Sequence, residues 1–98
     1  MTKKSYTKTG RTCRVTFTLP KDITAEKVAL CGDFNEWNPA EHLLKKRKSG
    51  IFSLTLSLAA KKEYRYRFLI DGEKWENDWD ADRYAANEFG TEDSVIVV

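Results

Sequence analysis

The sequence of 98 residues contains a single histidine, His42, and only two cysteines, Cys13 and Cys31. A lone histidine, with no identifiable nucleophile or orienting acid, does not supply the groups of an acid–base or nucleophilic centre. The two cysteines lack the spacing of a metal site or of a Cys-x-x-Cys redox pair. We therefore predict a protein that is not an enzyme and that uses no cofactor and no metal ion.

Long apolar runs and an excess of charge of one sign are also missing. No run is long enough for a membrane helix, and the first residues are polar, unlike a signal peptide, so we expect a cytoplasmic protein without membrane contact. The 17 basic and 15 acidic residues give a net charge of +2, which does not by itself imply a polyanionic partner. The basic run Lys45–Lys48 is typical of a solvated loop or strand edge, with phosphate contact as the alternative. We predict no nucleic-acid partner; single-strand binding would show strong salt dependence.

Four neighbouring carboxylates lie at Glu76, Asp78, Asp80 and Asp82. A glycoside hydrolase needs two carboxyl groups on opposite sides of a bound sugar, and close neighbours on one short segment are poorly placed for that. The three aspartates also match the start of a calcium-binding loop, but Arg83 stands where that loop needs glycine. These observations favour a solvated acidic turn.

Strict alternation of apolar and polar residues is the main structural signal that the sequence contains. It occurs over 13–19, 51–58 and 64–70, and it predicts half-buried strands, the first of them ending at Pro20. In the third segment Arg65 and Arg67 share the face opposite the core. Cys13 has the strand phase of the core residues and Cys31 the opposite phase, which argues against a disulfide.

Shorter segments add further strands at Val28–Cys31, near Leu43 and Leu44, around Trp75 and around Tyr84, and the β-branched run Ser94–Val98 predicts a buried strand that closes a sheet. No segment has helical periodicity. The sequence thus predicts an all-β, immunoglobulin-like antiparallel sandwich of about seven or eight strands. Residues 1–11 are expected to form a flexible tail and residues 12–98 a single, monomeric domain.

Two tryptophans each follow a strand and a turn. Trp37 comes shortly after Gly32 and Asp33, residue types that end strands, and we expect it on a loop. Trp75 follows Asp71-Gly72, a strong hairpin signal, and we expect it at the start of the returning strand. In a chain without a catalytic set, this pairing favours a protein that binds a flat ligand.

Three motifs occur in a familiar order: Gly32-Asp33-Phe34-Asn35-Glu36-Trp37, then 66–72 (YRFLIDG), then 87–95 (NEFGTEDSV). Together they resemble family 48 carbohydrate-binding modules. This family includes the glycogen-binding domain of the AMP-activated protein kinase β subunit and the N-terminal early-set domains of isoamylases and glycogen-branching enzymes. The resemblance covers residues 13–98 and implies binding of α-glucan.

The resemblance also implies a set of binding residues. Two tryptophans of the kinase-type domains stack on sugar rings, a basic residue follows the tyrosine of the middle motif, and a late loop completes the site. Carried over to this sequence, these residues are Trp37, Trp75, Arg67, Phe89, Thr91 and Asp93. Arg67 replaces the family's lysine, Phe89 its leucine and Asp93 its asparagine, and two residues instead of one separate Gly72 from Trp75. Trp79 matches no family role and is interpreted as structural.

The functional prediction is non-catalytic binding of a glycogen-like or starch-like α-1,4-glucan. The alternative is an interaction module that has lost sugar binding and docks on a glycogen-active enzyme or kinase-like subunit. At the level of single residues, a loop tryptophan can instead cover one end of the core, and Phe89 can be a core residue. Arg67 can likewise form an ion pair across strands.

Overall fold

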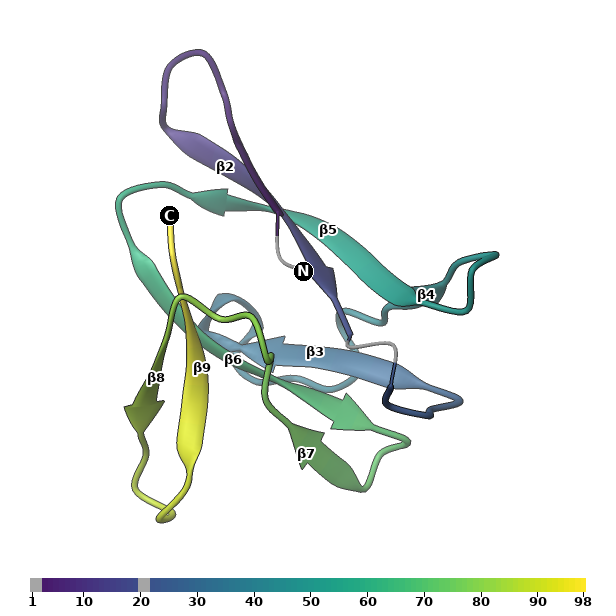
Figure 1. Cartoon of the computed structure of the whole chain (residues 1–98). Coiled ribbons are helices and arrows are strands. Elements are labelled where there is room, and N and C mark those ends of the chain that lie inside the picture. Colours follow the sequence, from purple (N-terminus) through teal and green to yellow (C-terminus); the bar gives the residue numbers. More distant parts are fainter. Residues whose placement is uncertain (1–2, 20–21) are drawn as a thin grey trace.

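The computed structural model describes residues 3–19 and 22–98, which form two antiparallel sheets packed face to face (Figure 1). The first sheet has the order β1-β2-β5-β4, with bounds β1 (Lys3–Tyr6), β2 (Thr12–Thr18), β5 (Phe52–Ala59) and β4 (Lys45–Lys46). The second has the order β3-β6-β9-β8, with β3 (Val28–Gly32), β6 (Glu63–Ile70), β9 (Glu92–Val97) and β8 (Arg83–Ala86). A short strand, β7 (Lys74–Glu76), also pairs with β6, and a 3-10 turn, η1 (Asp33–Asn35), follows β3. The predicted all-β, immunoglobulin-like sandwich is confirmed. Within the described ranges no helix has the length and apolar character needed to cross a membrane.

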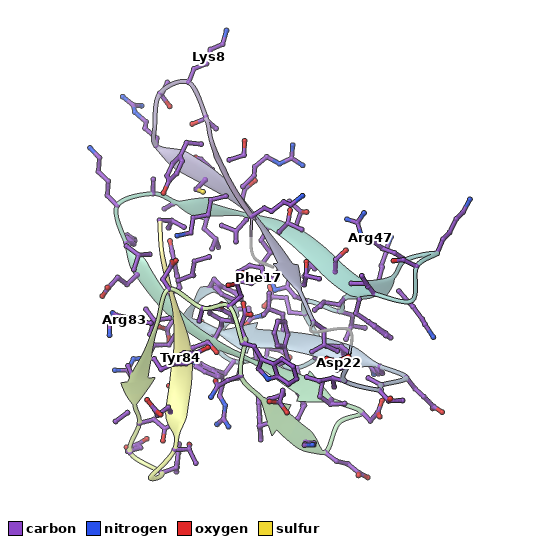
Figure 2. The ribbon with its side chains drawn as sticks, viewed as in Figure 1. Lys8, Phe17, Asp22, Arg47, Arg83 and Tyr84 are labelled. Atoms are coloured by element: carbon purple, nitrogen blue, oxygen red, sulfur yellow. The ribbon has the colours of Figure 1, made fainter. Side chains whose placement is uncertain are left out.

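The core lies between the two sheets and is built by the alternation seen in the sequence. In β2, Val15 and Phe17 are fully buried, and in β6 so are Tyr66 and Phe68. The rings of Phe17 and Tyr66, one from each sheet, meet edge to face with centroids 5.0 Å apart. Figure 2 shows Phe17 projecting from its strand toward the opposite sheet. Because each core strand points every second side chain inward, the residues between them form the two outer faces of the sandwich.

Strand β1 lies in the segment that was predicted to be a flexible tail. Residues 3–6 pair with β2, and the Lys4 ammonium donates to Asp82 Oδ2 at 2.6 Å and to the Val97 carbonyl at 2.8 Å. All four residues of β1 are exposed, so the segment has no apolar alternation by which the sequence could reveal a strand. With β1 included, the described residues form nine strands. The predicted strand end at Pro20 lies outside the described residues.

Two shorter predictions differ in detail. The strand expected near Leu43 and Leu44 begins later, as β4, while Leu43 forms only an isolated bridge with Ala29. Strand β9 does not close its sheet but lies between β6 and β8, so β8 forms that edge. Cys13 is buried in the core and Cys31 pairs with Arg67 on the opposite phase, as the strand phases predicted; both are free thiols.

A buried carboxylate links the core to the segment after β7. Asp78 is 1% exposed, and its Oδ2 accepts a hydrogen bond from the Tyr66 hydroxyl at 2.7 Å. The Asp78 amide donates to Ser94 Oγ, and its carbonyl accepts from the Tyr84 hydroxyl. The aspartate expected in a solvated acidic turn is therefore a buried connector between β6, β8 and β9.

Tyr66→Phe removes one bond from this carboxylate without changing the size of the ring. Because hydrogen bonds to charged groups contribute more than neutral ones, we expect the free energy of unfolding to fall by about 1.5–3 kcal/mol. Thermal denaturation followed by circular dichroism measures this loss. Tyr6→Phe is the matched control, since Tyr6 is 52% exposed; equal melting temperatures for the two variants would contradict the role given to Tyr66.

Candidate functional site

The outer face of the second sheet provides the floor of the site. Across β3, β6 and β7 the register aligns Cys31 with Arg67 and Leu69 with Trp75, so these side chains share the face that points away from the core. Arg65 lies on the same face, two residues from Arg67 along β6. Cys31 is fully buried beneath this face, and that burial raises the pKa of its thiol.

Trp37 reaches this face through a turn that reverses the chain after β3. Glu36 and Trp37 have φ angles of 55° and 60°, and the Trp37 amide donates to the Gly32 carbonyl at 3.0 Å. A bulky residue rarely adopts the left-handed conformation, and such conformations persist where the surroundings hold them, often at functional sites. Asp33 provides that hold, because its Oδ1 accepts from the indole Nε1 at 3.1 Å while its Oδ2 accepts from the Arg65 amide at 3.0 Å.

The buried side chain of Asn35 holds the same turn through hydrogen bonds to the backbone of β3. Its Oδ1 accepts from the Gly32 amide at 3.0 Å, and its Nδ2 donates to the Leu30 carbonyl at 2.8 Å. Nδ2 also lies 2.8 Å from His42 Nδ1. The single histidine of the chain therefore helps to hold the turn that presents Trp37.

Trp75 is positioned by the hairpin that joins β6 to β7, as the Asp71-Gly72 signal predicted. Both turn residues have positive φ, 52° and 71°, and the Glu73 amide donates to the Ile70 carbonyl at 3.0 Å. The extra residue before the tryptophan is accommodated within this turn, which leaves Trp75 paired with its strand partner on the outer face.

The hairpin is also bonded to the residues just before β3, because Asp71 Oδ1 accepts from the amides of Glu26 and Lys27 at 2.9 and 2.8 Å. The elements that present the two indoles are thereby braced against each other.

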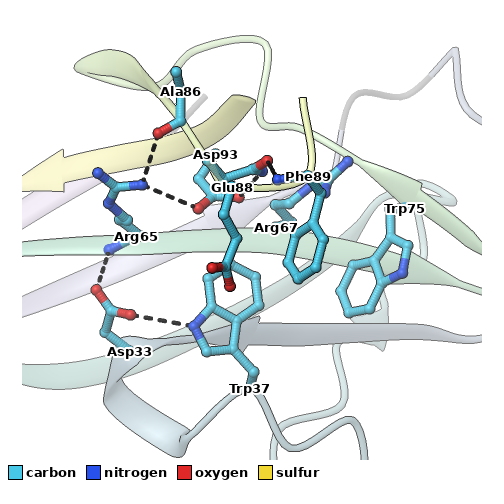
Figure 3. A pocket seen from close by; sticks show the side chains of 10 residues that line it. Asp33, Trp37, Arg65, Arg67, Trp75, Ala86, Glu88, Phe89 and Asp93 are labelled. Carbon is cyan, nitrogen blue, oxygen red and sulfur yellow. Dashed lines mark hydrogen bonds and ion pairs between the residues drawn. The ribbon is translucent and has the colours of Figure 1, made fainter. Parts of the chain in front are cut away.

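The two indole rings meet in a single cavity. Their centroids are 6.3 Å apart and their planes are inclined by 63°. Trp75 is 41% exposed and Trp37 is partly buried. The Arg67 guanidinium carbon lies 5.6 Å from the centre of the Trp75 ring, a cation–π arrangement that orients both groups. Figure 3 shows the rings converging beneath Phe89, with Arg67 behind it.

The hairpin between β8 and β9 forms the rim of the cavity. Asn87 holds it together: its Oδ1 accepts from the amides of Phe89 and Thr91, and its Nδ2 donates to Asp93 Oδ1 at 3.0 Å. Phe89 is 81% exposed at the tip, and Figure 3 shows the Glu88 carboxylate extending toward Trp37. An aromatic ring and a carboxylate thus project over the indoles from a tight turn.

The two arginines of the floor differ in what they bind. Arg65 Nη1 donates to the Ala86 carbonyl at 3.2 Å and lies 3.5 Å from Asp93 Oδ2. The Nε of Arg67 is buried and has no hydrogen-bond partner among the residues that the structure describes. An unpaired buried donor is costly, and this Nε is too deep to meet a ligand in the cavity, so the donors that Arg67 can offer are its terminal Nη groups. Arg65 therefore braces the rim, and Arg67 is the cation available to a ligand.

Five of the six residues expected at a binding site line this cavity of about 530 Å³: Trp37, Arg67, Trp75, Phe89 and Asp93. Thr91 lies outside the lining, and its hydroxyl is engaged with the Asn87 side chain. The sequence-based set missed five lining residues: Asp33, Arg65, Ala86, Asn87 and Glu88. Strand alternation had already placed Arg65 on the right face, whereas the partners of Asp33 and Asn87 depend on contacts between distant segments.

The acidic segment around Asp80 offers no metal centre. Asp78 is engaged with Tyr66 and Ser94, and Asp82 is paired with Lys4. Partial burial raises the pKa of Asp82, but the hydrogen bond and charge of Lys4 outweigh it, and the net shift is downward. In the described ranges no three His, Cys, Asp or Glu side chains are grouped to hold an ion.

A β-sandwich whose outer face carries a shallow cavity of inclined aromatic rings and a free guanidinium has the form of a ligand-binding module. The family model for carbohydrate-binding module 48, described as the isoamylase N-terminal domain, matches residues 22–85. The chain therefore belongs to carbohydrate-binding module family 48, and carbohydrate is its ligand class. Among curated proteins no match is found.

Proposed function

We propose that the cavity binds an α-glucan, such as a glycogen-like or starch-like chain, without catalysing its hydrolysis. The observation that carries the proposal is the meeting of Trp37, Trp75 and the Arg67 guanidinium in one cavity. A glucose ring has a patch of C–H groups on one face and hydroxyls around its rim, so it suits an apolar plate with donors beside it. Indole supplies the plate and guanidinium the donors.

The inclination of the rings favours a curved ligand. An α-1,4-linked glucan follows a helical path, whereas a β-1,4-linked glucan is an extended ribbon. Plates inclined by 63° can each contact a different face of a curved chain, but they cannot lie flat against the same side of a ribbon. Phe89 at the rim can close over the chain from the remaining side.

The cavity's carboxylates support a non-catalytic role. Glycoside hydrolysis requires two carboxyl groups free to act on the substrate from opposite sides. Asp33 accepts hydrogen bonds from Trp37 and Arg65, and Asp93 accepts from Asn87 and lies beside Arg65. Of the lining carboxylates, Glu88 alone has no protein donor among the described residues. One free carboxylate does not make an acid–base pair.

The expected affinity is modest. Sugar hydroxyls exchange good hydrogen bonds with water for similar ones with protein, and the site is open. We expect a dissociation constant between about 1 μM and 1 mM, or roughly −8 to −4 kcal/mol. A polymer that engages several copies of the protein raises the apparent affinity.

Native electrophoresis in gels cast with soluble polysaccharide tests the proposal. We expect retardation by glycogen and amylose, little change with a soluble β-glucan, and the same ranking at low and high salt because the ligand is neutral. Incubation with maltoheptaose should yield no shorter products on chromatography. Equal mobility with and without α-glucan would overturn the proposal. It would favour an interaction module, for which the exposed Phe89 is an available contact.

Arg67→Ala removes the guanidinium donors together with the cation–π contact to Trp75, but it keeps both indole rings. We expect binding of maltoheptaose to weaken about tenfold, because a charge-assisted hydrogen bond is lost, and we expect Arg67→Lys to be intermediate. Isothermal titration calorimetry measures the change. Arg83→Ala is the control, since Arg83 pairs with Glu63 outside the cavity; equal losses in Arg67→Ala and Arg83→Ala would exclude a specific role for Arg67.

A further inference from the structure

The charges of the chain are divided between the two sheets. Segments 3–19 and 43–62 form β1, β2, β4, β5 and the turns that flank them, and they contain eleven lysines and arginines but no aspartate or glutamate. All 15 acidic residues lie in 22–42 and 63–98, which supply the second sheet. The small net charge of the chain therefore conceals one basic sheet and one acidic sheet.

The outer face of the basic sheet carries hydroxyl and cationic side chains in regular rows. Because Val15 and Phe17 point into the core, their neighbours in β2 point outward, and the register extends each row across the sheet. The rows are Lys3–Thr16–Thr55, Ser5–Arg14–Ser57 and Thr18–Ser53–Lys45. In the third row Ser53 is buried, and its hydroxyl accepts from Arg47 Nε. A shallow hollow of about 330 Å³ lies over the first two rows. This outer face is hereafter called the basic face.

The cations of the basic face are not neutralised within the chain. Of the sheet's basic residues in the described ranges, only Lys4 forms an ion pair, with Asp82 across the sandwich. Lys3, Arg14 and Lys45 are exposed and have no carboxylate partner in those ranges. Like charges gathered on one face repel each other and create a positive potential, which an anionic partner would relieve.

We propose that the basic face is a docking surface for an acidic segment of a partner protein. Its three rows contain no aromatic ring on which nucleic-acid bases could stack, and a four-stranded sheet is too broad for a DNA groove that admits an α-helix or a two-stranded ribbon. They also contain no large apolar side chain to insert into a lipid surface. Lysine and arginine cations interspersed with hydroxyls instead suit carboxylate side chains spread over an extended strand or loop.

The position of the basic face separates it from the carbohydrate site. The cavity lies on the outer face of the second sheet, and the basic face lies on the opposite side of the sandwich. A bound sugar does not cover any residue of the three rows. The protein can therefore hold a carbohydrate on one side and an acidic protein on the other, and the two contacts are separable by mutation.

Fluorescence anisotropy with a labelled oligoglutamate peptide tests this surface. The double variant Arg14→Glu/Lys45→Glu reverses two charges on the basic face. The double variant Lys27→Glu/Lys74→Glu makes the same change in net charge on the acidic half. We expect salt-sensitive binding by the parent protein, a loss of about tenfold or more in the first variant, and a change below about threefold in the second. Circular dichroism checks that both variants are folded.

Three outcomes would overturn the proposal. These are no binding of oligoglutamate at low salt, equal losses in the two double variants, or tighter binding of an oligonucleotide or anionic vesicles at matched charge. The first variant should retain the parent's retardation by glycogen, because the cavity is untouched. That comparison keeps a failure of the basic face distinct from a failure of carbohydrate binding.

Discussion

Trp37→Ala and Trp75→Ala are each expected to weaken binding of maltoheptaose by about 10- to 100-fold, or roughly 1.4–2.8 kcal/mol. In the proposed complex a sugar ring covers each indole, so each substitution removes an aromatic plate, and aromatic rings lose little rotamer entropy on binding. Because the rings lie 6.3 Å apart and the proposed ligand contacts both, the effects should not simply add in the double variant. Isothermal titration calorimetry with maltoheptaose measures all three.

Trp79→Ala is the matched control for this prediction. Trp79 is 57% exposed and donates its indole hydrogen to Glu76, but it lies outside the cavity. We expect its substitution to change the affinity less than about twofold. If Trp79→Ala weakened binding as much as Trp37→Ala does, the sugar-binding surface would have to be placed elsewhere.

Gly32→Ala is expected to cost about 3 kcal/mol or more of unfolding free energy. A Cβ at this position would lie 2.5 Å from the Arg65 carbonyl oxygen, 2.8 Å from Tyr66 Cβ and 2.9 Å from Phe34 Cζ. The first two contacts are with the paired strand β6, which cannot move away without breaking the β3–β6 ladder. Overpacking of this kind typically costs about 1–3 kcal/mol, and a backbone contact places the cost at the upper end. We expect the melting temperature to fall by about 12–24 °C.

Gly10→Ala is the control for this prediction, because it strains the backbone of a glycine without creating a steric clash. Gly10 has a φ of +71°, and a Cβ added there would meet no atom within 4 Å, so alanine experiences only the strain of the left-handed conformation. That strain costs about 1–2 kcal/mol. Gly32→Ala should also reduce glucan binding, since the turn to Trp37 begins at this residue, whereas Gly10→Ala should not. Similar melting temperatures for the two variants would contradict the clash at Gly32.

The sequence predicted those parts of the fold that depend on local alternation. Strands β2, β5 and β6 were recognisable because one face of each is buried, which produces a period of two. Strand β1 was missed because all four of its residues are exposed, and its ion pair from Lys4 to Asp82 joins segments far apart in the chain. The residues around Lys4 give no indication that its partner, Asp82, lies 78 residues away in the sequence.

The same distinction explains what could be predicted of the site. The turn signals placed Trp37 and Trp75 beyond the ends of strands, and the resemblance indicated which side chains to examine. Alternation made Arg65 and Arg67 equivalent, because both occupy the outer face of β6. The resemblance selected Arg67, and the packing of the β8–β9 hairpin against Arg65 gives the physical difference: Arg65 is bonded to Ala86 and Asp93, and Arg67 is not.

The construction of the cavity also bears on how ligand preference can change over evolutionary time. Trp75 lies in a paired strand and Trp37 is fastened to β6 through Asp33, so both depend on the folding of the whole sheet. Phe89 and Glu88 instead occupy the tip of a two-stranded hairpin whose shape is maintained largely by Asn87. Exchanges at those two tip positions can therefore alter the shape and charge of the cavity's rim with little loss of folding stability.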